Sequence, residues 1–326
     1  MAIAWLRRSG AAVRAVGLGA LFVLGACAAI PEGAPAADEA NTSDAAGDAV
    51  VQAIPPAAYS EQPAEPFPPP SPPAPPPEWN FEGELIQGGY IVGTAPDTTS
   101  TATLGEQTLD LGEDNRFFAA FDRDAPATVT LRAQLEDGST TAETLTIAPR
   151  DWQIERVNVA RRSGGTSEAW WQKRKPEWEA IQAARAMETG ATGWQDNFIW
   201  PVTGRISGLF GRQRIYRGEP GSYHSGIDIA PGAGTPFAAP ASGVVVLARE
   251  GFSLEGNLII IDHGMGLNSA FLHASRIVVD EGDRVEKGQH IGNVGSSGRA
   301  TGPHLHWSLK WKDSRLDPLL LTGPME

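Results

Sequence analysis

The sequence contains very little cysteine. Cys27 is its only cysteine in 326 residues, so the chain can form neither an internal disulfide nor a cysteine-based zinc ribbon. Basic residues are also in deficit, with 26 Lys and Arg against 39 Asp and Glu and a formal net charge of −13. Binding to nucleic-acid phosphates needs a local excess of Lys and Arg, so we expect no nucleic-acid partner. The length and the 41% hydrophobic content allow two folded domains.

The apolar run at residues 15–26 is too short to span a bilayer as a helix. It follows three arginines, which is typical of an export signal. The run ends in Leu24-Gly25-Ala26-Cys27, which resembles the bacterial lipobox, where the cysteine becomes a lipidated N-terminus. We therefore expect residues 1–27 to be a lipoprotein signal with Cys27 as the lipid attachment site. Ordinary signal cleavage, with the cysteine incidental, is the alternative.

This signal predicts an exported protein that is anchored by lipid at the periplasmic face of a bacterial membrane. Residue 28 is Ala and not Asp, and by resemblance to the sorting pattern of such lipoproteins this favours the outer membrane. Residues 28–78 are rich in Pro and Ala, with the densest prolines at 66–77. Such a segment has little apolar surface to bury, so we expect a disordered tether.

Residues 79–157 are predicted to form a small β-sandwich of short antiparallel strands. Residues 128–135 alternate polar and apolar side chains and end at Asp137-Gly138, a strong hairpin signal, with residues 143–147 as the partner strand. Shorter strands are expected at 84–86 and 108–111. This domain has no histidine, so we interpret it as a spacer or docking module, with binding to the cell wall as the alternative.

Residues 158–197 are predicted to be a helical connector. Ser167 and Glu168 can start a helix, and one helical face would carry two tryptophans and two apolar residues, Trp171, Trp178, Ile181 and Ala184. Pro176 predicts a break within it. We expect the tryptophans to pack this connector onto the rest of the protein; a regulatory segment that covers the catalytic groove is the alternative.

Residues 198–326 are expected to be mainly β. Apolar strands are predicted at 243–248, 257–264 and 267–272, and no long helix is expected between residues 201 and 318. Two stretches of this region bring together metal-ligating side chains. Residues His224 and Asp228 are four apart, and His304 and His306 are two apart, so in strands each pair lies on one face.

These four residues suit a metal site, but one of them is in excess. A catalytic zinc has three protein ligands and an open position for water, whose pKa it lowers towards about 7. One histidine of the set should therefore be left over as a general base or an oxyanion donor. The spacing alone does not say which one.

Three motifs in order resemble the lysostaphin-type (LytM-like) zinc peptidases, which cut peptide cross-links of bacterial cell walls. They are the His-x-x-x-Asp at His224 and Asp228, the separate His273, and the His-x-His at His304 and His306, which follows the glycine-rich stretch 292–303. The resemblance covers the last 40% or so of the chain. It departs after His306, where Trp307-Ser308 replaces the more usual aromatic-Glu pair, and this affects substrate fit more than metal binding.

The resemblance implies a fold, a cofactor and roles for the residues. It implies an antiparallel β-sheet domain of the duplicated hybrid motif type, with one zinc ion per chain bound by His224, Asp228 and His306. It further implies that His304 and His273 flank the metal-activated water. The expected activity is that of a zinc endopeptidase acting on peptidoglycan cross-links, with proteins of cell division or wall remodelling as partners.

Two other functions compete with this one. Some proteins that resemble this family are non-catalytic regulators that activate other wall hydrolases, but they typically lack zinc ligands, and all five positions are filled here. A biotinyl- or lipoyl-type carrier domain is disfavoured because Lys287 lacks the hairpin signature of a modified lysine. We interpret His263 and His290, the remaining histidines, as structural.

Overall fold

The computed structural model describes residues 77–160 and 167–325. The predicted signal, Cys27 and the tether as far as residue 76 lie outside these residues. Within the described ranges, no helix has both the length and the apolar character that crossing a membrane requires. These described residues are mainly β, as predicted, and contain one long helix.

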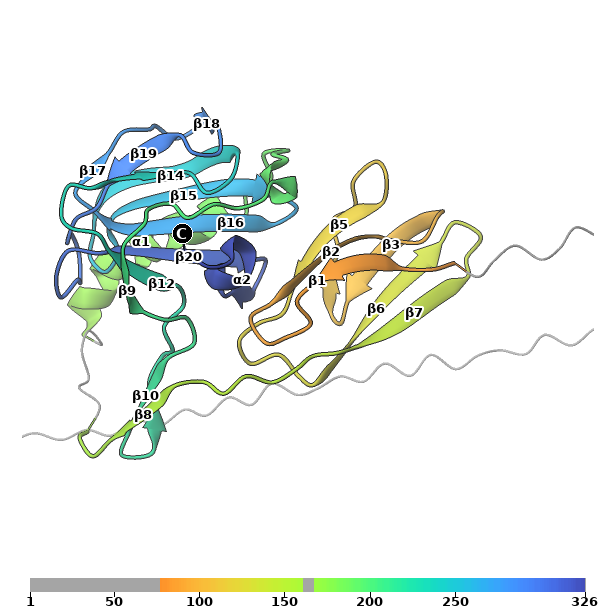
Figure 1. Cartoon of the computed structure of the whole chain (residues 1–326), viewed down its shortest axis with the longest axis horizontal. Helices are drawn as coiled ribbons and strands as arrows, with labels where there is room; N and C mark the ends of the chain where they lie inside the picture. The colour runs from red at the N-terminus through yellow and green to blue at the C-terminus, as the bar shows by residue number, and fades with distance from the viewer. Residues whose placement is uncertain (1–76, 161–166, 326) are drawn as a thin grey trace, which may run out of the picture. The chain divides into compact units, whose positions relative to one another are not determined.

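The segment from residue 80 to 146 forms two antiparallel sheets (Figure 1). The first has the order β1-β2-β5 and the second β4-β3-β6-β7. Their strands are β1 (Asn80–Gly83), β2 (Tyr90–Thr94), β3 (Thr99–Leu104), β4 (Gln107–Thr108), β5 (Arg116–Ala120), β6 (Thr128–Leu135) and β7 (Thr140–Thr146). The aromatic and aliphatic side chains between the sheets, such as Phe117 and Leu131, are fully buried. The predicted sandwich is therefore confirmed.

The hairpin β6–β7 forms as the sequence predicts, because it turns at Asp137-Gly138 and pairs Thr128 with Thr146. Two of the shorter predicted strands are wrong. The first strand ends at Gly83, and Ile86 makes only an isolated bridge with Ala148. The strand that was expected at 108–111 is reduced to Gln107–Thr108.

The strand β8 (Ile154–Val157) is not part of the sandwich, although residues 79–157 were assigned to that domain. It pairs in parallel with β10 (Gln213–Tyr216) of the C-terminal domain, and β10 in turn pairs with β11 (Glu219–Pro220). The end of the segment that was assigned to the sandwich therefore contributes to the C-terminal domain. Such a long-range pairing has no local signal in the sequence.

The helix α1 (Glu168–Arg185) starts where the sequence predicts, with the Ser167 hydroxyl accepting from the backbone N–H of Trp170. The predicted break at Pro176 is wrong, since the helix runs through it. One contact on each side of the proline holds the helix: Arg174 forms an ion pair with Glu255 at 2.7 Å, and the Glu177 carboxylate accepts a hydrogen bond from the backbone N–H of Ser253 at 2.9 Å. These contacts offset the hydrogen bond that proline cannot make.

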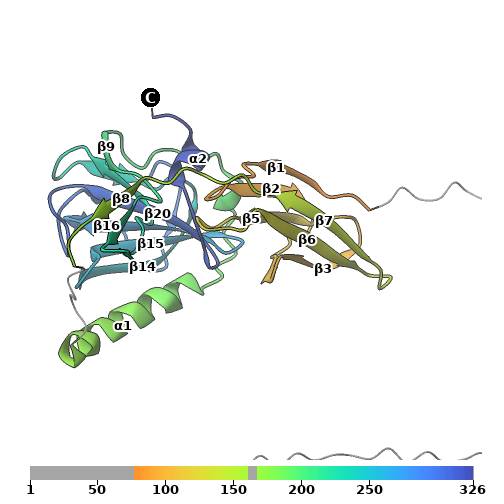
Figure 2. The same cartoon turned by 90° about the horizontal axis from the view of Figure 1, so that it is seen from below.

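The face that α1 buries also differs from the prediction. Ile181 and Ala184 pack against β14 and β15, as Figure 2 shows for the helix lying along these strands. Trp171 and Trp178 are instead 43% and 46% exposed. The prediction that tryptophans pack the connector is therefore wrong. A short 3-10 helix, η1 (Gly193–Gln195), follows.

The C-terminal domain is built on an eight-stranded sheet whose main path is β18-β14-β15-β16-β20-β12-β9, with β21 paired to β20. Its strands are β9 (Arg205–Gly208), β12 (Ile227–Ala230), β14 (Gly243–Phe252), β15 (Gly256–Gly264), β16 (Leu267–Ala274), β18 (Arg284–Val285), β20 (Leu305–Trp311) and β21 (Ser314–Leu316). The three strands that were predicted at 243–248, 257–264 and 267–272 are confirmed as the centre of this sheet.

A small second sheet has the order β13-β19-β17. Its strands are β13 (Pro236–Ala238), β19 (His290–Asn293) and β17 (Arg276–Ile277), and the only helix described after α1 and η1 is α2 (Pro318–Thr322). Along β20 the side chains alternate. Leu305, Trp307 and Leu309 enter the main core, so His306 and Ser308 lie on the opposite face of the sheet.

Candidate metal centre

The pairing of β12 with β20 places Asp228 directly opposite His306. Side chains that lie opposite each other in an antiparallel pair have Cβ atoms about 5 Å apart, so the carboxylate and the imidazole can meet. The Asp228 Oδ1 atom lies 2.9 Å from Nδ1 of His306. Ile227 and Ile229 on either side of the aspartate are fully buried, which fixes the strand and therefore the direction of the carboxylate.

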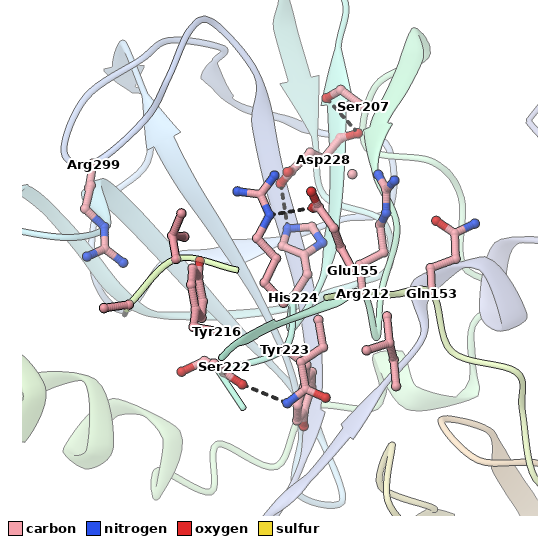
Figure 3. A pocket seen from close by; sticks show the side chains of 17 residues that line it. Gln153, Glu155, Ser207, Arg212, Tyr216, Ser222, Tyr223, His224, Asp228 and Arg299 are labelled. Carbon is pink, nitrogen blue, oxygen red and sulfur yellow. Dashed lines mark hydrogen bonds and ion pairs between the residues drawn. The ribbon is translucent and has the colours of Figure 1, made fainter. Parts of the chain in front are cut away.

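His224 reaches the same point by a different route from the one predicted. Strand β12 begins only at Ile227, so His224 and Asp228 do not share a strand face. The backbone of His224 is instead hydrogen-bonded to the segment before β10, to Gly211 N and Arg212 O at 2.9 and 2.8 Å. His224 nevertheless lies next to Asp228, with Nε2 of His224 3.0 Å from Oδ1 of Asp228 (Figure 3).

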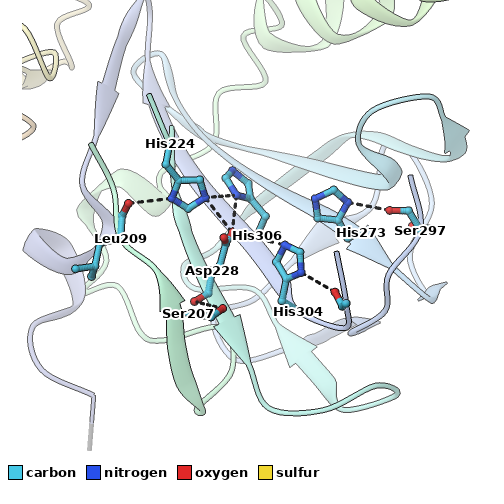
Figure 4. A network of polar contacts seen from close by, with 9 residues as sticks. Ser207, Leu209, His224, Asp228, His273, Ser297, His304 and His306 are labelled. Atoms are coloured by element: carbon cyan, nitrogen blue, oxygen red, sulfur yellow. Dashed lines mark hydrogen bonds and ion pairs between the residues drawn. The ribbon is translucent and has the colours of Figure 1, made fainter. Parts of the chain in front are cut away.

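Three ligand atoms thus converge on one point (Figure 4). The distances between Nε2 of His224, Nδ1 of His306 and Oδ1 of Asp228 are 3.0, 2.9 and 3.1 Å, with the longest between the two nitrogens. The Nδ1–H of His224 donates to the backbone carbonyl of Leu209 at 2.9 Å. In a neutral ring this fixes the tautomer whose Nε2 lone pair points at the other two atoms.

The charges of this cluster are strongly coupled. Burial would raise the pKa of Asp228, but hydrogen bonds from His224 and His306 hold it well below its usual value. Burial disfavours the charged form of His224, but the hydrogen bond to Asp228 and its charge outweigh this and raise the pKa of His224. Burial lowers the pKa of His306, and Asp228 offsets this only in part. The carboxylate therefore stays ionised and attracts one positive charge to the cluster.

The three residues fit a zinc ion. Ligands at the usual 2.0–2.1 Å from a tetrahedral zinc lie about 3.3 Å from one another, close to the spacing found here. Two imidazole nitrogens and one carboxylate are a common catalytic zinc set, and they leave a fourth position open. Glycine keeps the space clear, because a Cβ at Gly208 would lie 2.4 Å from Oδ2 of Asp228 and one at Gly226 would lie 2.9 Å from Nε2 of His306.

His304 and His273 lie beside this triangle and are held in the same manner. The Nδ1–H of His304 donates to the carbonyl of Gly302, and that of His273 to the carbonyl of Ser297, both at 2.8 Å. The two rings are 4.9 Å apart between centroids, and Nε2 of His304 lies 3.7 Å from Oδ1 of Asp228. All five residues that were singled out in the sequence are therefore brought together.

His273 has a backbone conformation that only a few non-glycine residues adopt. Its φ is 67°, at the end of strand β16, and its N–H donates to the carbonyl of Glu255 at 2.9 Å. Strained backbone of this kind is held by surrounding contacts and is concentrated at functional sites. Burial, followed by the charge of His304, lowers the pKa of His273, which favours a neutral ring in the native protein.

A cavity of about 1130 Å³ lies beside the cluster, with His224 and Asp228 in its wall (Figure 3). Two apolar residues of the connecting segment, Ile154 and Val159, also line it and are 38% and 56% exposed. The sequence interpretation missed this contribution. The pairing of β8 with β10 creates it, and nothing in residues 153–160 alone indicates such a partner.

The remaining histidines have different surroundings. His263 is fully buried, with Nδ1 2.8 Å from the carbonyl of Ser242 and Nε2 2.8 Å from Oγ of Ser269. Burial lowers the pKa of His263 to about 4. His290 is exposed, and its Nε2 lies 3.0 Å from the carbonyl of Gly292. The environment of His263 agrees with the structural role expected of it, whereas the exposed His290 makes only this local contact.

Residues 222–318 match peptidase family M23, so the chain carries an M23 peptidase domain. A Vibrio cholerae protein named peptidoglycan DD-endopeptidase ShyA is 41% identical over 125 residues, which are 37% of this chain and 28% of that protein. A Pseudomonas aeruginosa protein named lipoprotein NlpD/LppB homolog is 36% identical over 127 residues, which are 39% of each chain. The chain thus spans less than half the length of these curated relatives.

A crystal structure from Pseudomonas aeruginosa that is assigned to peptidase M23 has a similar fold. It is 26% identical, with a TM-score of 0.57, and the match covers 74% of this chain and 96% of that one. The similarity therefore extends over more of the chain than the M23 domain alone. This agrees with the predicted fold class.

Proposed function

We propose that this chain is a zinc-dependent endopeptidase that hydrolyses peptide cross-links of bacterial peptidoglycan. The observation that carries the proposal is the triangle of ligand atoms from His224, Asp228 and His306, with edges of 2.9–3.1 Å and two further imidazoles beside it. The substrate class is supported by the relative that is named a peptidoglycan DD-endopeptidase. One zinc ion per chain is expected, since the described residues contain one such group of ligands.

A zinc ion bound by these three residues would supply a Lewis acid for the peptide carbonyl and would activate a water molecule as the nucleophile. His304 and His273 do the proton chemistry. Because each donates its Nδ1–H to a backbone carbonyl, a neutral ring offers the lone pair of Nε2 as a general base. After it accepts the proton of the water, the same Nε2–H can donate to the oxyanion or to the leaving amine nitrogen.

The test combines a digestion with a metal measurement. Purified sacculi are treated with the wild-type chain and with His304→Ala, and the released muropeptides are identified by mass spectrometry while zinc is measured in both proteins. We expect the wild type to release monomers from cross-linked dimers, and the variant to keep its zinc but release none. A wild-type protein that contains zinc and leaves every cross-link intact would rule out the peptidase proposal.

The alternative function is a non-catalytic protein that binds and activates other wall hydrolases. The similarity to a protein named lipoprotein NlpD/LppB homolog gives a reason to test it. The complete set of five site residues argues for the enzyme, since a regulator has no need of an intact metal centre. If the chain is an activator, its wild-type form and its His306→Ala variant should stimulate a second hydrolase equally well. If it is a peptidase, the variant should lose the hydrolytic activity that the wild type has.

We also propose that the chain is exported and lipid-anchored at Cys27, at the periplasmic face of the outer membrane. The name of the lipoprotein relative supports this proposal, as does the Leu24–Cys27 motif. Residues 28–78 would then act as a tether and the sandwich as a spacer, which places the M23 domain near the wall. Labelling with a radioactive fatty acid, in the wild type and in Cys27→Ser, tests the anchor.

A further inference from the structure

Three arginines line the cavity beside the candidate metal centre. They are Arg212, Arg214 and Arg299. The guanidinium of Arg214 is already neutralised, because its Nε lies 2.6 Å from the carboxylate of Glu155. In the described ranges 77–160 and 167–325, no carboxylate lies within ion-pair distance of Arg212 or Arg299, and both are exposed. Two unpaired positive charges therefore face the cavity.

These two arginines are attached to opposite sides of the site. The carbonyl of Arg212 accepts from the backbone N–H of His224 at 2.8 Å, so Arg212 belongs to the side of the metal triangle. Arg299 lies two residues after Ser297, the residue whose carbonyl orients His273, and its own N–H donates to Leu254 O at 2.9 Å. Figure 3 shows them on either side of His224.

The backbone that carries Arg299 has little freedom. The hydroxyl of Ser297 donates to the carbonyl of Ala274 and accepts from the N–H of Asn257, both at 2.8 Å. Gly298 has a φ of 70°, and a Cβ at this position would lie 2.3 Å from the backbone nitrogen of Gly256. The loop is therefore fixed to the sheet where Arg299 projects, so the charge has a defined place relative to the imidazoles.

The charge of the cavity is opposite to that of the chain. The whole chain has a formal net charge of −13, yet the cavity is lined by three arginines and only two carboxylates, Glu155 and Asp228. Both carboxylates are engaged, one by Arg214 and the other by the histidines. A local excess of positive charge in a cleft raises the local concentration of anionic ligands.

We propose that Arg212 and Arg299 are substrate-binding residues that each bind a carboxylate of the cross-linked peptide, one on either side of the bond that is cut. Guanidinium groups bind carboxylates through two parallel hydrogen bonds, which gives geometric specificity as well as affinity. The site would thus prefer cross-links whose residues carry free carboxylates over uncharged glycine bridges. This inference rests on the peptidase function proposed above and names its substrate class.

The test uses two synthetic cross-linked peptides that differ only at the side-chain or terminal carboxylates next to the scissile bond. One peptide has free carboxylates there, and in the other these are carboxamides. Their Kd values are measured on the zinc-loaded full chain carrying His304→Ala, and their cleavage on the otherwise wild-type chain. We expect the free carboxylates to lower Kd by about 100-fold, about tenfold for each arginine contact.

Substituting one arginine at a time should show how much each side of the site contributes to the preference for free carboxylates. Arg212→Gln and Arg299→Gln should each reduce the ratio of Kd values about tenfold, and the double variant should abolish it, with the zinc content unchanged. The matched control is Arg284→Gln. Arg284 is also exposed, but it lies on β18 at the opposite end of the sheet path from β9, so the same change of charge should leave the ratio at its wild-type value.

The outcomes separate this inference from the proposed function. Equal Kd values for the two peptides would overturn the carboxylate inference even if both were cleaved. A preference that survives in the double variant would overturn the assignment to these arginines. A preference in binding without cleavage by the wild type would support the inference while the endopeptidase function fails.

Discussion

The buried His263 and the histidines of the candidate metal centre are two groups that share one contact. His263 places Nδ1 2.8 Å from a backbone carbonyl, and so do His273 and His304. His306 and Trp307 are neighbours on β20, so their side chains point to opposite faces. The indole of Trp307 donates to Ser269 at 3.3 Å, and this serine is also the partner of His263.

The two groups differ at the second nitrogen. The Nε2 of His263 lies 2.8 Å from the hydroxyl of Ser269, so both ring nitrogens are satisfied within the protein. The Nε2 of His224 lies instead 3.0 Å from a carboxylate oxygen and 3.1 Å from the nitrogen of another imidazole. Such a set of acceptors needs a cation or a proton between them, whereas a completed chain of hydrogen bonds needs nothing more.

This comparison teaches how a structural histidine can be told from a functional one. Burial does not separate them, since His306 is only 8% exposed and His263 is fully buried. The partner of the second nitrogen does separate them. Substitutions in one group should therefore change activity and metal content, and substitutions in the other should change stability.

The largest effect is expected for His306→Ala. This substitution removes one of three ligands, so the protein should lose its zinc, and hydrolysis of cross-links should fall by at least about 10⁴-fold because metal activation of water is lost. Elemental analysis of the purified protein and muropeptide release from sacculi would measure both losses. The control is His290→Ala, whose ring is exposed and should change neither quantity. Full digestion by His306→Ala would show that the ligand assignment is wrong.

His304→Ala should have the second largest effect. Because this histidine is expected to transfer protons and not to bind the metal, turnover should fall about 10³-fold while zinc content stays at about one ion per chain. The comparison of zinc content between His304→Ala and His306→Ala is the measurement that matters. A His304→Ala protein without metal would place His304 among the ligands.

The site was more predictable from the sequence than its local geometry. The order of the motifs, through the resemblance to a known family, singled out five positions, and the structure brings these five side chains together. The strand interpretation of His224 failed, since its backbone is set by hydrogen bonds to Gly211 and Arg212, and the chain between these segments follows no periodic pattern. Convergence of residues in loops depends on contacts that are distant in sequence.

The fold was predictable where a segment carries its own signal. Strands β14 and β15 contain apolar runs at residues 243–248 and 258–261, and the β6–β7 hairpin has its Asp-Gly turn. The packing of the helix α1 could not be predicted in the same way. Its periodicity indicates which residues share a face, but not how closely that face approaches the sheet. The small Ala184 and the aliphatic Ile181 pack on the sheet, and the two tryptophans stay exposed.

His263→Leu tests the other side of the comparison. The substitution removes the central member of a hydrogen-bonded chain and leaves the carbonyl of Ser242 and the hydroxyl of Ser269 buried without that partner. We expect the free energy of unfolding to fall by about 3 kcal/mol, with zinc content unchanged. Urea unfolding measures the loss, and His290→Leu should stay within about 0.5 kcal/mol of wild type because His290 is exposed. Loss of zinc in a folded His263→Leu protein would contradict the separation of the two groups.

The smallest effect is a pH dependence of that same loss. Burial lowers the pKa of His263 to about 4 in the native protein, against about 6.5 in an unfolded chain. Between these values the unfolded state binds a proton that the native state excludes, so the contribution of His263 to stability is fully present above pH 6.5 and is lost as the pH falls towards 4. The cost of His263→Leu should therefore shrink by about 2 kcal/mol between pH 7 and pH 5. Urea unfolding of both proteins in a chelator, which removes metal binding as a variable, gives this difference at each pH, and a cost that is the same at both would show that His263 is not held neutral by burial.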